Sequence, residues 1–433
     1  MSDFLKELIR TSEATGEGLP TWWSELRAAA VDRLRELSVP GRKDEEWRFL
    51  KLKPLTGRAW PSAGTSTVDV ADVVESRRIP EADGATLVFV NGRFSADHSS
   101  LDGITDAVTI APFSGLASED TTDLVRDYVA TQTYWADDVF WNGNTANFED
   151  GAVILVPRGE VVEPVVHLLF VGTGEEAGAV HPRNVIVAGE SAQVTVVEEY
   201  VGAGDGAYFH NVVDEVFVGA NASVNHFKVQ RDTDEAFHVA RNLVALSRDC
   251  RYVSTAVNIG AALSRNDSYA RYEGTNIDCN LDGLAFLKGT QVSDTHTAID
   301  HALPDSRSYQ LHKVIVDDRA HSVFNGKIFV RQDAQRTRSE QLNQNLLLST
   351  GSHVDTKPQL EILADDVVCA HGATVGQLED DHFFYLQSRG LTPEKAKALL
   401  TYAFAAEVLE TITVDSLRSS LEQEVLHATA GDE

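Results

Sequence analysis

The sequence predicts a mainly β protein built on repeated short strands, and two patterns support this fold class. Runs rich in β-branched residues recur from about Gly151 to residue 363 with little helical periodicity, as expected for strands. Small or polar turns precede several of these runs at steps of about 30 residues, which favours a β-solenoid whose coils stack on one another. A β-sandwich is the competing interpretation. The turns lie at 189–194 and 219–224 and, more weakly, at 247–252 and 276–281.

The N-terminal part predicts a mixture of helices and strands. Apolar residues follow helical spacing through most of residues 1–60, which indicates amphipathic helices. Residues 61–84 are rich in Ser, Thr, Gly and Asp and predict a linker. A strand is expected over Thr86–Val90, because the turn pair Asn91-Gly92 follows it directly.

The C-terminal part predicts helices. Helical periodicity returns from Asp380, with Gly390 ending one predicted helix and Thr392-Pro393 beginning the next. The order along the chain is thus mixed α/β, long β and then α. The expected domains are a mixed domain at 1–148, a β-helix core at 149–363 and a helical domain at 364–433.

Composition limits the classes of partner and compartment. The net charge of −29 over 433 residues repels phosphate backbones, so we expect no nucleic-acid partner. The three cysteines are odd in number and form no C-x-x-C pair, which argues against a disulfide framework and for a reducing compartment. The charged N-terminus lacks the apolar core of a signal peptide, and no apolar run approaches the ~18 residues of a membrane helix. We therefore expect a cytoplasmic protein without a membrane segment.

Motifs for nucleotide or hydrolytic chemistry are missing from the sequence. It contains no G-x-x-x-x-G-K-[ST] loop, G-x-S-x-G elbow or H-E-x-x-H pair. Asp294 with His296, and Asp300 with His301, would supply metal ligands if they converged in space. The alternative is that histidines of the β region lie singly on turns or pair with carboxylates. These histidines are His210, His226, His238, His296, His301, His312, His321 and His353.

Cys369 and His371 are the strongest candidates for a site. They lie two residues apart in a strand-like segment, so both side chains point to the same face. A soft thiolate beside a borderline imidazole suits iron, zinc or a sulfur-rich cluster. Two ligands rarely hold a metal alone, so we expect another surface to supply the rest. The alternative is a buried thiol beside a hydrogen-bonded imidazole.

Three segments carry a resemblance to a known family. They read D-V-V-C-A-H-G-A-T-V-G-Q-L at 366–378, F-Y-L-Q-S-R-G-L at 384–391 and K-D-E-E-W-R-F at 43–49. The first two closely resemble the SufB/SufD family of the SUF iron–sulfur cluster assembly system, and the C-A-H-G-A-T version resembles its SufD branch. The third resembles the N-terminal signature of the same family. Length and domain order agree as well, so the resemblance covers nearly the whole chain.

The resemblance implies a right-handed parallel β-helix flanked by helical domains, acting as a non-catalytic scaffold subunit with SufB and the SufC ATPase. It implies a transient iron–sulfur cluster or iron at the SufB–SufD contact, with none tightly bound to the isolated chain. His371 would be the leading ligand and Cys369 its companion. ATP hydrolysis would occur in SufC, docked on residues 383–404. The docking residues expected from this resemblance are Phe383, Phe384, Tyr385 and Arg389.

Two other functions remain open on the sequence alone. The first is a β-helix carbohydrate-active enzyme that uses clustered carboxylates such as Asp294 and Asp300. The second is a pure interaction module in which Cys369 and His371 are merely buried. An unpartnered solenoid edge also leaves a homodimer of the isolated chain open.

Overall fold

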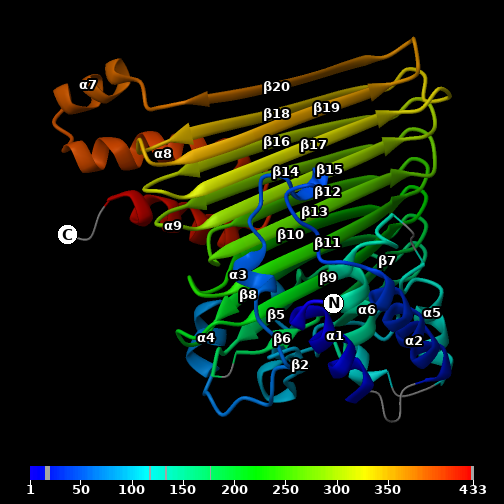
Figure 1. The fold of residues 1–433 in the computed structure, drawn as a ribbon. Coiled ribbons are helices and arrows are strands. Elements are labelled where there is room, and N and C mark those ends of the chain that lie inside the picture. Colours follow the sequence, from blue (N-terminus) through cyan, green and yellow to red (C-terminus); the bar gives the residue numbers. More distant parts are fainter. Residues whose placement is uncertain (15–19, 117–118, 132–133, 176, 431–433) are drawn as a thin grey trace.

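The computed structural model describes residues 1–14, 20–116, 119–131, 134–175 and 177–430, and a tall stack of β-strands forms its centre (Figure 1). The mainly β class is confirmed. The strands of the stack are β4 (Ala152–Val156), β5 (Val166–Gly172), β6 (Ala179–Val180), β7 (Arg183–Ala188), β8 (Gln193–Gly202), β9 (Phe209–Val218), β10 (Ser223–Arg231), β11 (Phe237–Leu246), β12 (Arg251–Asn258), β13 (Leu263–Tyr272), β14 (Asp278–Leu287), β15 (Val292–His301), β16 (Arg307–Val316), β17 (His321–Val330), β18 (Arg338–Leu347), β19 (His353–Ile362) and β20 (Val368–Gly376).

The chain winds between two sheets, each of ten strands among the described residues. From β8 onward, even-numbered strands form one sheet and odd-numbered strands the other, so each strand pairs in parallel with the strand two places along the chain. A sandwich of hairpins would pair sequential strands antiparallel. The alternation is that of a parallel β-solenoid, as the turn rhythm predicted.

The turn rhythm has a direct conformational cause. The residues two positions before β8, β10, β12, β14 and β16 all have φ between 57° and 66°. Asn and Asp tolerate this left-handed conformation better than other non-glycine residues, and they occupy four of the five positions. The side chains also bond from coil to coil, since Asn221 Nδ2 donates to Ser191 Oγ at 3.0 Å and Asn276 Nδ2 to Asp249 Oδ1 at 3.0 Å. The five residues are Ser191, Asn221, Asp249, Asn276 and Asp305.

The first helices of the N-terminal part pack on the outer face of the odd-numbered sheet, whereas its strands extend the ends of both sheets. Buried side chains of its helices, such as Phe4 and Leu34, share one hydrophobic cluster with Phe209 and Phe237 of the sheet. Its elements are α1 (Asp3–Ala14), α2 (Thr21–Glu36), η1 (Glu45–Trp47), α3 (Lys53–Thr56), α4 (Ala71–Ser76), η2 (Pro80–Ala82), β1 (Thr86–Val90), β2 (Arg93–Phe94), η3 (Ala96–His98), β3 (Thr109–Pro112), η4 (Phe113–Gly115), α5 (Glu119–Arg126) and α6 (Val139–Asn147).

The predicted linker at 61–84 is wrong. This segment contains α4 and η2, and Val70, Ile79 and Ala82 are buried against the strand stack. The polar residues are real, but the few apolar ones between them are enough to hold the segment on the sheet. The predicted strand and turn are confirmed, because β1 pairs antiparallel with β2 through Asn91 and Gly92, both at positive φ.

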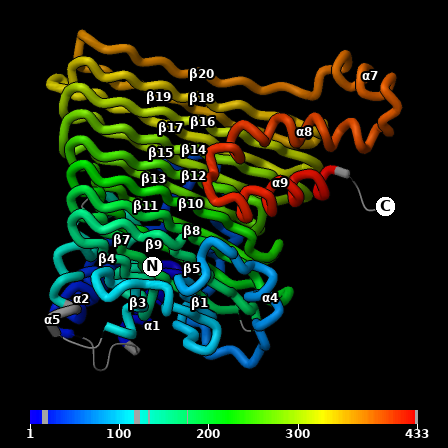
Figure 2. Tube along the Cα trace, turned by 180° about the vertical axis from the view of Figure 1, so that it is seen from behind, coloured from blue at the N-terminus to red at the C-terminus, as the bar shows by residue number. Residues whose placement is uncertain are grey.

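The C-terminal helices are α7 (Asp380–Ser388), α8 (Pro393–Leu409) and α9 (Asp415–Ala430). Figure 2 shows α8 and α9 lying over the strand stack, with α7 extending beyond its edge. Val408 and Leu421 of these helices pack with Leu284 and Ile315 of the even-numbered sheet. The sheet continues past residue 363, since β20 pairs with β18, so the Cys369–His371 pair lies on the last strand of the solenoid and the helices begin only at Asp380. In the part of the chain that the structure describes, no helix combines the length and apolarity needed to cross a membrane.

Candidate functional site

The last coil of the solenoid is open. Among the described residues, β19 pairs only with β17 and β20 only with β18, so both strands are sheet edges. The side chains of Val368, Val375 and Leu363 on this coil are 69%, 51% and 68% exposed. A long strand edge with exposed apolar side chains is a template for pairing with another chain. We therefore identify this end of the stack as a candidate site.

Cys369 and His371 point to the interior face of β20. They are in register with Ser339 and Gln341 of β18, and Ser339 lies inside the stack, where its hydroxyl bonds to that of Ser308 at 2.7 Å. Cys369 is half-buried against an apolar cluster that includes Leu360, whereas His371 is exposed. The expected strand and the shared face are thus observed, and His371 is exposed because the described chain has no further coil to cover it.

The chemistry of this pair is incomplete. Burial raises the pKa of the Cys369 thiol, opposed by the backbone N–H of Ser339, so a metal would have to displace the thiol proton to bind. Both amide atoms of Gln341, the register neighbour of His371, are buried without a hydrogen-bond partner. Groups of three or more metal-ligating side chains within the described residues include neither Cys369 nor His371. Two donors at an open strand edge require further ligands from another surface.

The docking residues expected on α7 are accessible. Phe384 and Tyr385 are 72% and 56% exposed, and the guanidinium carbon of Arg389 lies 5.1 Å from the centroid of the Tyr385 ring. Phe383 is half-buried. A large aromatic surface on a helix that extends beyond the stack fits a protein-binding role.

The two acid–histidine pairs at 294–301 do not converge. His296 Nε2 lies 2.9 Å from Asp294 Oδ1 on the outer face, and His301 Nε2 lies 2.9 Å from Ser308 Oγ inside the stack. Burial lowers the pKa of His301 to about 4. Asp300 accepts two bonds of 2.8 Å from Arg331. The alternative interpretation, in which histidines pair with carboxylates, is confirmed for His210, His226, His238, His296, His321 and His353.

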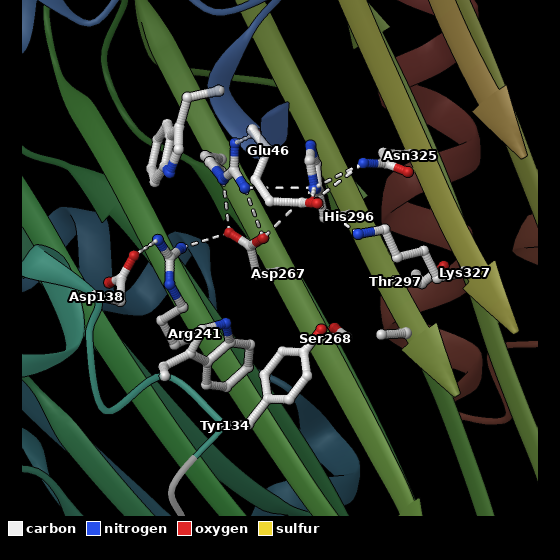
Figure 3. Close-up of a pocket in the computed structure, with 14 residues that line it drawn as sticks. Glu46, Tyr134, Asp138, Arg241, Asp267, Ser268, His296, Thr297, Asn325 and Lys327 are labelled. Atoms are coloured by element: carbon white, nitrogen blue, oxygen red, sulfur yellow. Dashed lines mark hydrogen bonds and ion pairs between the residues drawn. The ribbon is translucent and has the colours of Figure 1, made fainter. Parts of the chain in front are cut away.

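A cavity of about 230 Å³ lies where the N-terminal segment crosses the odd-numbered sheet (Figure 3). Glu46 of the K-D-E-E-W-R-F block lines it and is paired with Lys327 and with His296 Nδ1 at 3.3 Å. These two partners hold the pKa of Glu46 at about 2, despite burial. Arg265 bonds to Asp294 at 2.8 Å. Because these charged groups are paired within the chain, the cavity is best explained as the contact that holds the N-terminal segment on the sheet.

This contact could not be predicted from the sequence. Glu46 and Lys327 are 281 positions apart, and only the winding of the solenoid brings them together. Asp294, offered above as a catalytic carboxylate, is committed to Arg265 and His296 in this contact. Because of these contacts, Asp294 lacks the free access to substrate that a glycosidase carboxylate needs.

Two family models match the chain: the SUF system FeS cluster assembly SufBD core domain over residues 170–404, and the SufBD protein N-terminal region over residues 7–168. An iron–sulfur cluster assembly SufBD family protein of Synechocystis sp. is 39% identical over 406 residues, covering 92% of this chain and 89% of that protein. The iron–sulfur cluster assembly protein SufD of Escherichia coli is 32% identical over 395 residues, with coverage of 90% and 89%. SufD of Bacillus subtilis is 28% identical over 411 residues, with 93% coverage of both chains.

The core model alone spans more than half of the chain, and the two models together span nearly all of it. The fold agrees with this assignment in its parallel solenoid and its flanking helical parts. The chain belongs to the SufBD family of iron–sulfur cluster assembly proteins.

Proposed function

We propose that this chain is a non-catalytic scaffold subunit for iron–sulfur cluster assembly, acting in the cytoplasm in a complex with SufB and the SufC ATPase. One observation carries the proposal: Cys369 and His371 present a thiol and an imidazole together at an open strand edge. SufB adds to this edge through backbone pairing, as in other strand-addition complexes. The free thiols of Cys250, Cys279 and Cys369 fit a reducing compartment.

The cargo of the site is a transient iron–sulfur cluster or iron. His371 supplies the exposed nitrogen ligand and Cys369 the sulfur ligand, and SufB supplies the remainder. Because two ligands hold such a group weakly, the isolated chain binds no cluster tightly. Cluster retention then depends on the arrival of SufB, which is the behaviour expected of a shared assembly site.

SufC docks on the exposed aromatic surface of α7 and the start of α8, and ATP hydrolysis takes place in that subunit. Phe384 and Tyr385 are the central contacts because they are the most exposed aromatic side chains of this surface. Movement of α7 and α8 by SufC changes the packing between α8 and the sheet that carries β20. ATP turnover in SufC would in this way open and close the shared site.

The test is the His371→Ala variant in the complex reconstituted with SufB and SufC. We expect iron and acid-labile sulfide per complex to fall at least about tenfold, as for loss of a metal ligand or its support, while size-exclusion chromatography shows the complex intact. His427→Ala, which removes an exposed histidine of α9, is the matched control. Unchanged cluster content in the Cys369→Ser/His371→Ala double variant would contradict the ligand role and leave a pure interaction module.

A further inference from the structure

A second group of potential metal ligands lies on β17 and β19, whereas Cys369 and His371 lie on β20 of the other sheet. His321 begins β17 and His353 begins β19, and the two are direct register partners. Asp355 follows His353 by two positions, so it shares the same outward face of the strand. The Nε2 atoms of His321 and His353 lie 2.9 Å and 3.3 Å from the same Oδ2 atom of Asp355. One ligand atom from each residue lies within 4.8 Å of the other two.

These separations match those of ligands around one metal ion. Atoms that share a tetrahedral metal at about 2.0–2.1 Å lie about 3.3 Å apart, and neighbouring ligands of an octahedral ion at about 2.1 Å lie about 3.0 Å apart. The observed distances of 2.9 Å and 3.3 Å between ligand atoms therefore match the spacing of neighbouring ligands around one metal ion. Little rearrangement is needed before an ion is held.

The surroundings leave room for an ion and its water ligands. The side chains of His321, His353 and Asp355 are 23%, 66% and 25% exposed. On one side the neighbour of His321 in the sheet is the apolar Val292, and on the other side β19 is an edge strand among the described residues. The net charge of −29 also attracts cations to the surface.

The other group of three potential metal ligands within the described residues differs in this respect. Asp232 is fully buried and accepts from His210 and His238 at 2.9 Å each, and it also accepts from Tyr208 and Gln230. All its acceptor capacity is used inside the protein. Within the part of the chain that the structure describes, the Oδ2 atom of Asp355 has only the two imidazoles as partners.

We propose that His321, His353 and Asp355 form a binding site for one divalent first-row transition-metal ion, of the class of Zn²⁺, Fe²⁺ or Co²⁺. Two imidazoles and one carboxylate are the ligand set of open mononuclear sites that complete their shell with water. Imidazole nitrogens select against Mg²⁺ and Ca²⁺, which prefer oxygen. The site is independent of the cluster ligands and binds its ion without SufB.

The test is titration of the isolated full-length chain with Co²⁺, followed by the d–d absorption of the bound ion, in the Cys369→Ser/His371→Ala background. This background removes the cluster ligands, so its result does not depend on the cluster-assembly proposal. We expect one Co²⁺ per chain, displaced by Zn²⁺. His353→Ala, His321→Ala and Asp355→Asn should each weaken binding at least about tenfold. Asp355→Asn keeps the shape and a hydrogen-bond acceptor, so it separates a metal ligand from a carboxylate that only orients imidazoles.

The matched control is His382→Ala. That histidine also lies beside a carboxylate, at 3.5 Å from Glu379, but it has no second histidine. We expect Co²⁺ binding to be unchanged by this substitution. The proposal is overturned if the three ligand variants bind Co²⁺ as tightly as the background, or if His382→Ala lowers binding equally. His353→Ala removes a mostly exposed ring, so circular dichroism should show this variant folded and the comparison valid.

Discussion

The guanidinium carbon of Arg265 lies 3.7 Å from the centroid of a Trp47 ring. A side chain of the solenoid therefore stacks on a side chain of the N-terminal segment. Trp47 is 6% exposed and packs in the same cluster as Phe140. We predict that Trp47→Ala destabilises the protein by about 3–5 kcal/mol, because it leaves a large cavity and removes the ring on which the Arg265 guanidinium stacks. Thermal unfolding and limited proteolysis near residue 47 measure this. Lys43→Ala, on the exposed side of the same segment, should change neither, and equal effects would contradict the assigned contact.

Cys369 should be the thiol that reagents reach in the native chain. Cys250 and Cys279 are buried, and burial raises the pKa of Cys250 to about 12. Cys369 is half-buried with a raised pKa, so its alkylation by iodoacetamide should be slow near pH 7 and accelerate as pH rises. Peptide mass spectrometry identifies the labelled residue. In the proposed complex SufB should protect it, and labelling unaffected by SufB would contradict the proposed interface.

Asp282 should make stability depend on pH. Burial raises its pKa to about 7, opposed by the backbone N–H of Leu311, which donates to Oδ1 at 2.9 Å where the β14–β16 ladder is interrupted. The folded chain keeps this proton between about pH 4 and pH 7 whereas the unfolded chain releases it, so stability falls as pH rises through that window.

Asp282→Asn should remove this loss. At pH 8 we expect a gain on the order of 2–4 kcal/mol, seen as a higher Tm, and at pH 4 almost none. Asp83→Asn, an exposed control, should leave the pH profile unchanged. A gain of equal size at both pH values would show that the carboxylate of Asp282 is not the titrating group.

A charge on the open edge should prevent association. Val368 is 69% exposed on β20, and a lysine there would place its ammonium against any added strand. We predict that Val368→Lys abolishes self-association of the isolated chain and weakens SufB binding, as measured by analytical ultracentrifugation. Val161→Lys introduces the same charge at a 47% exposed position and should change neither self-association nor SufB binding. Association that survives Val368→Lys would move the interface away from β20.

The sequence predicted those features that depend on neighbouring residues. The turn residues Asn221 and Asp249 indicated the coil spacing because left-handed turns select Asn and Asp, and strict alternation placed Cys369 and His371 on one face. The linker predicted at 61–84 is wrong because two or three buried apolar residues are enough to hold this polar segment on the strand stack. The contact of Glu46 with Lys327 and the grouping of His321 with His353 depend on which coils become neighbours, and that information is absent from any short window.

The two ends of the strand stack differ in how they stop. At the N-terminal end of the described chain, the sheets finish in the short antiparallel strands β2 and β3. So short an edge has few free backbone N–H and C=O groups with which another strand could pair. At the other end, β19 and β20 are long strands, and each has one edge without a strand partner among the described residues. A body with one extendable end and one capped end can join another face to face, but it cannot propagate a filament. Association through strand pairing therefore stops at two chains.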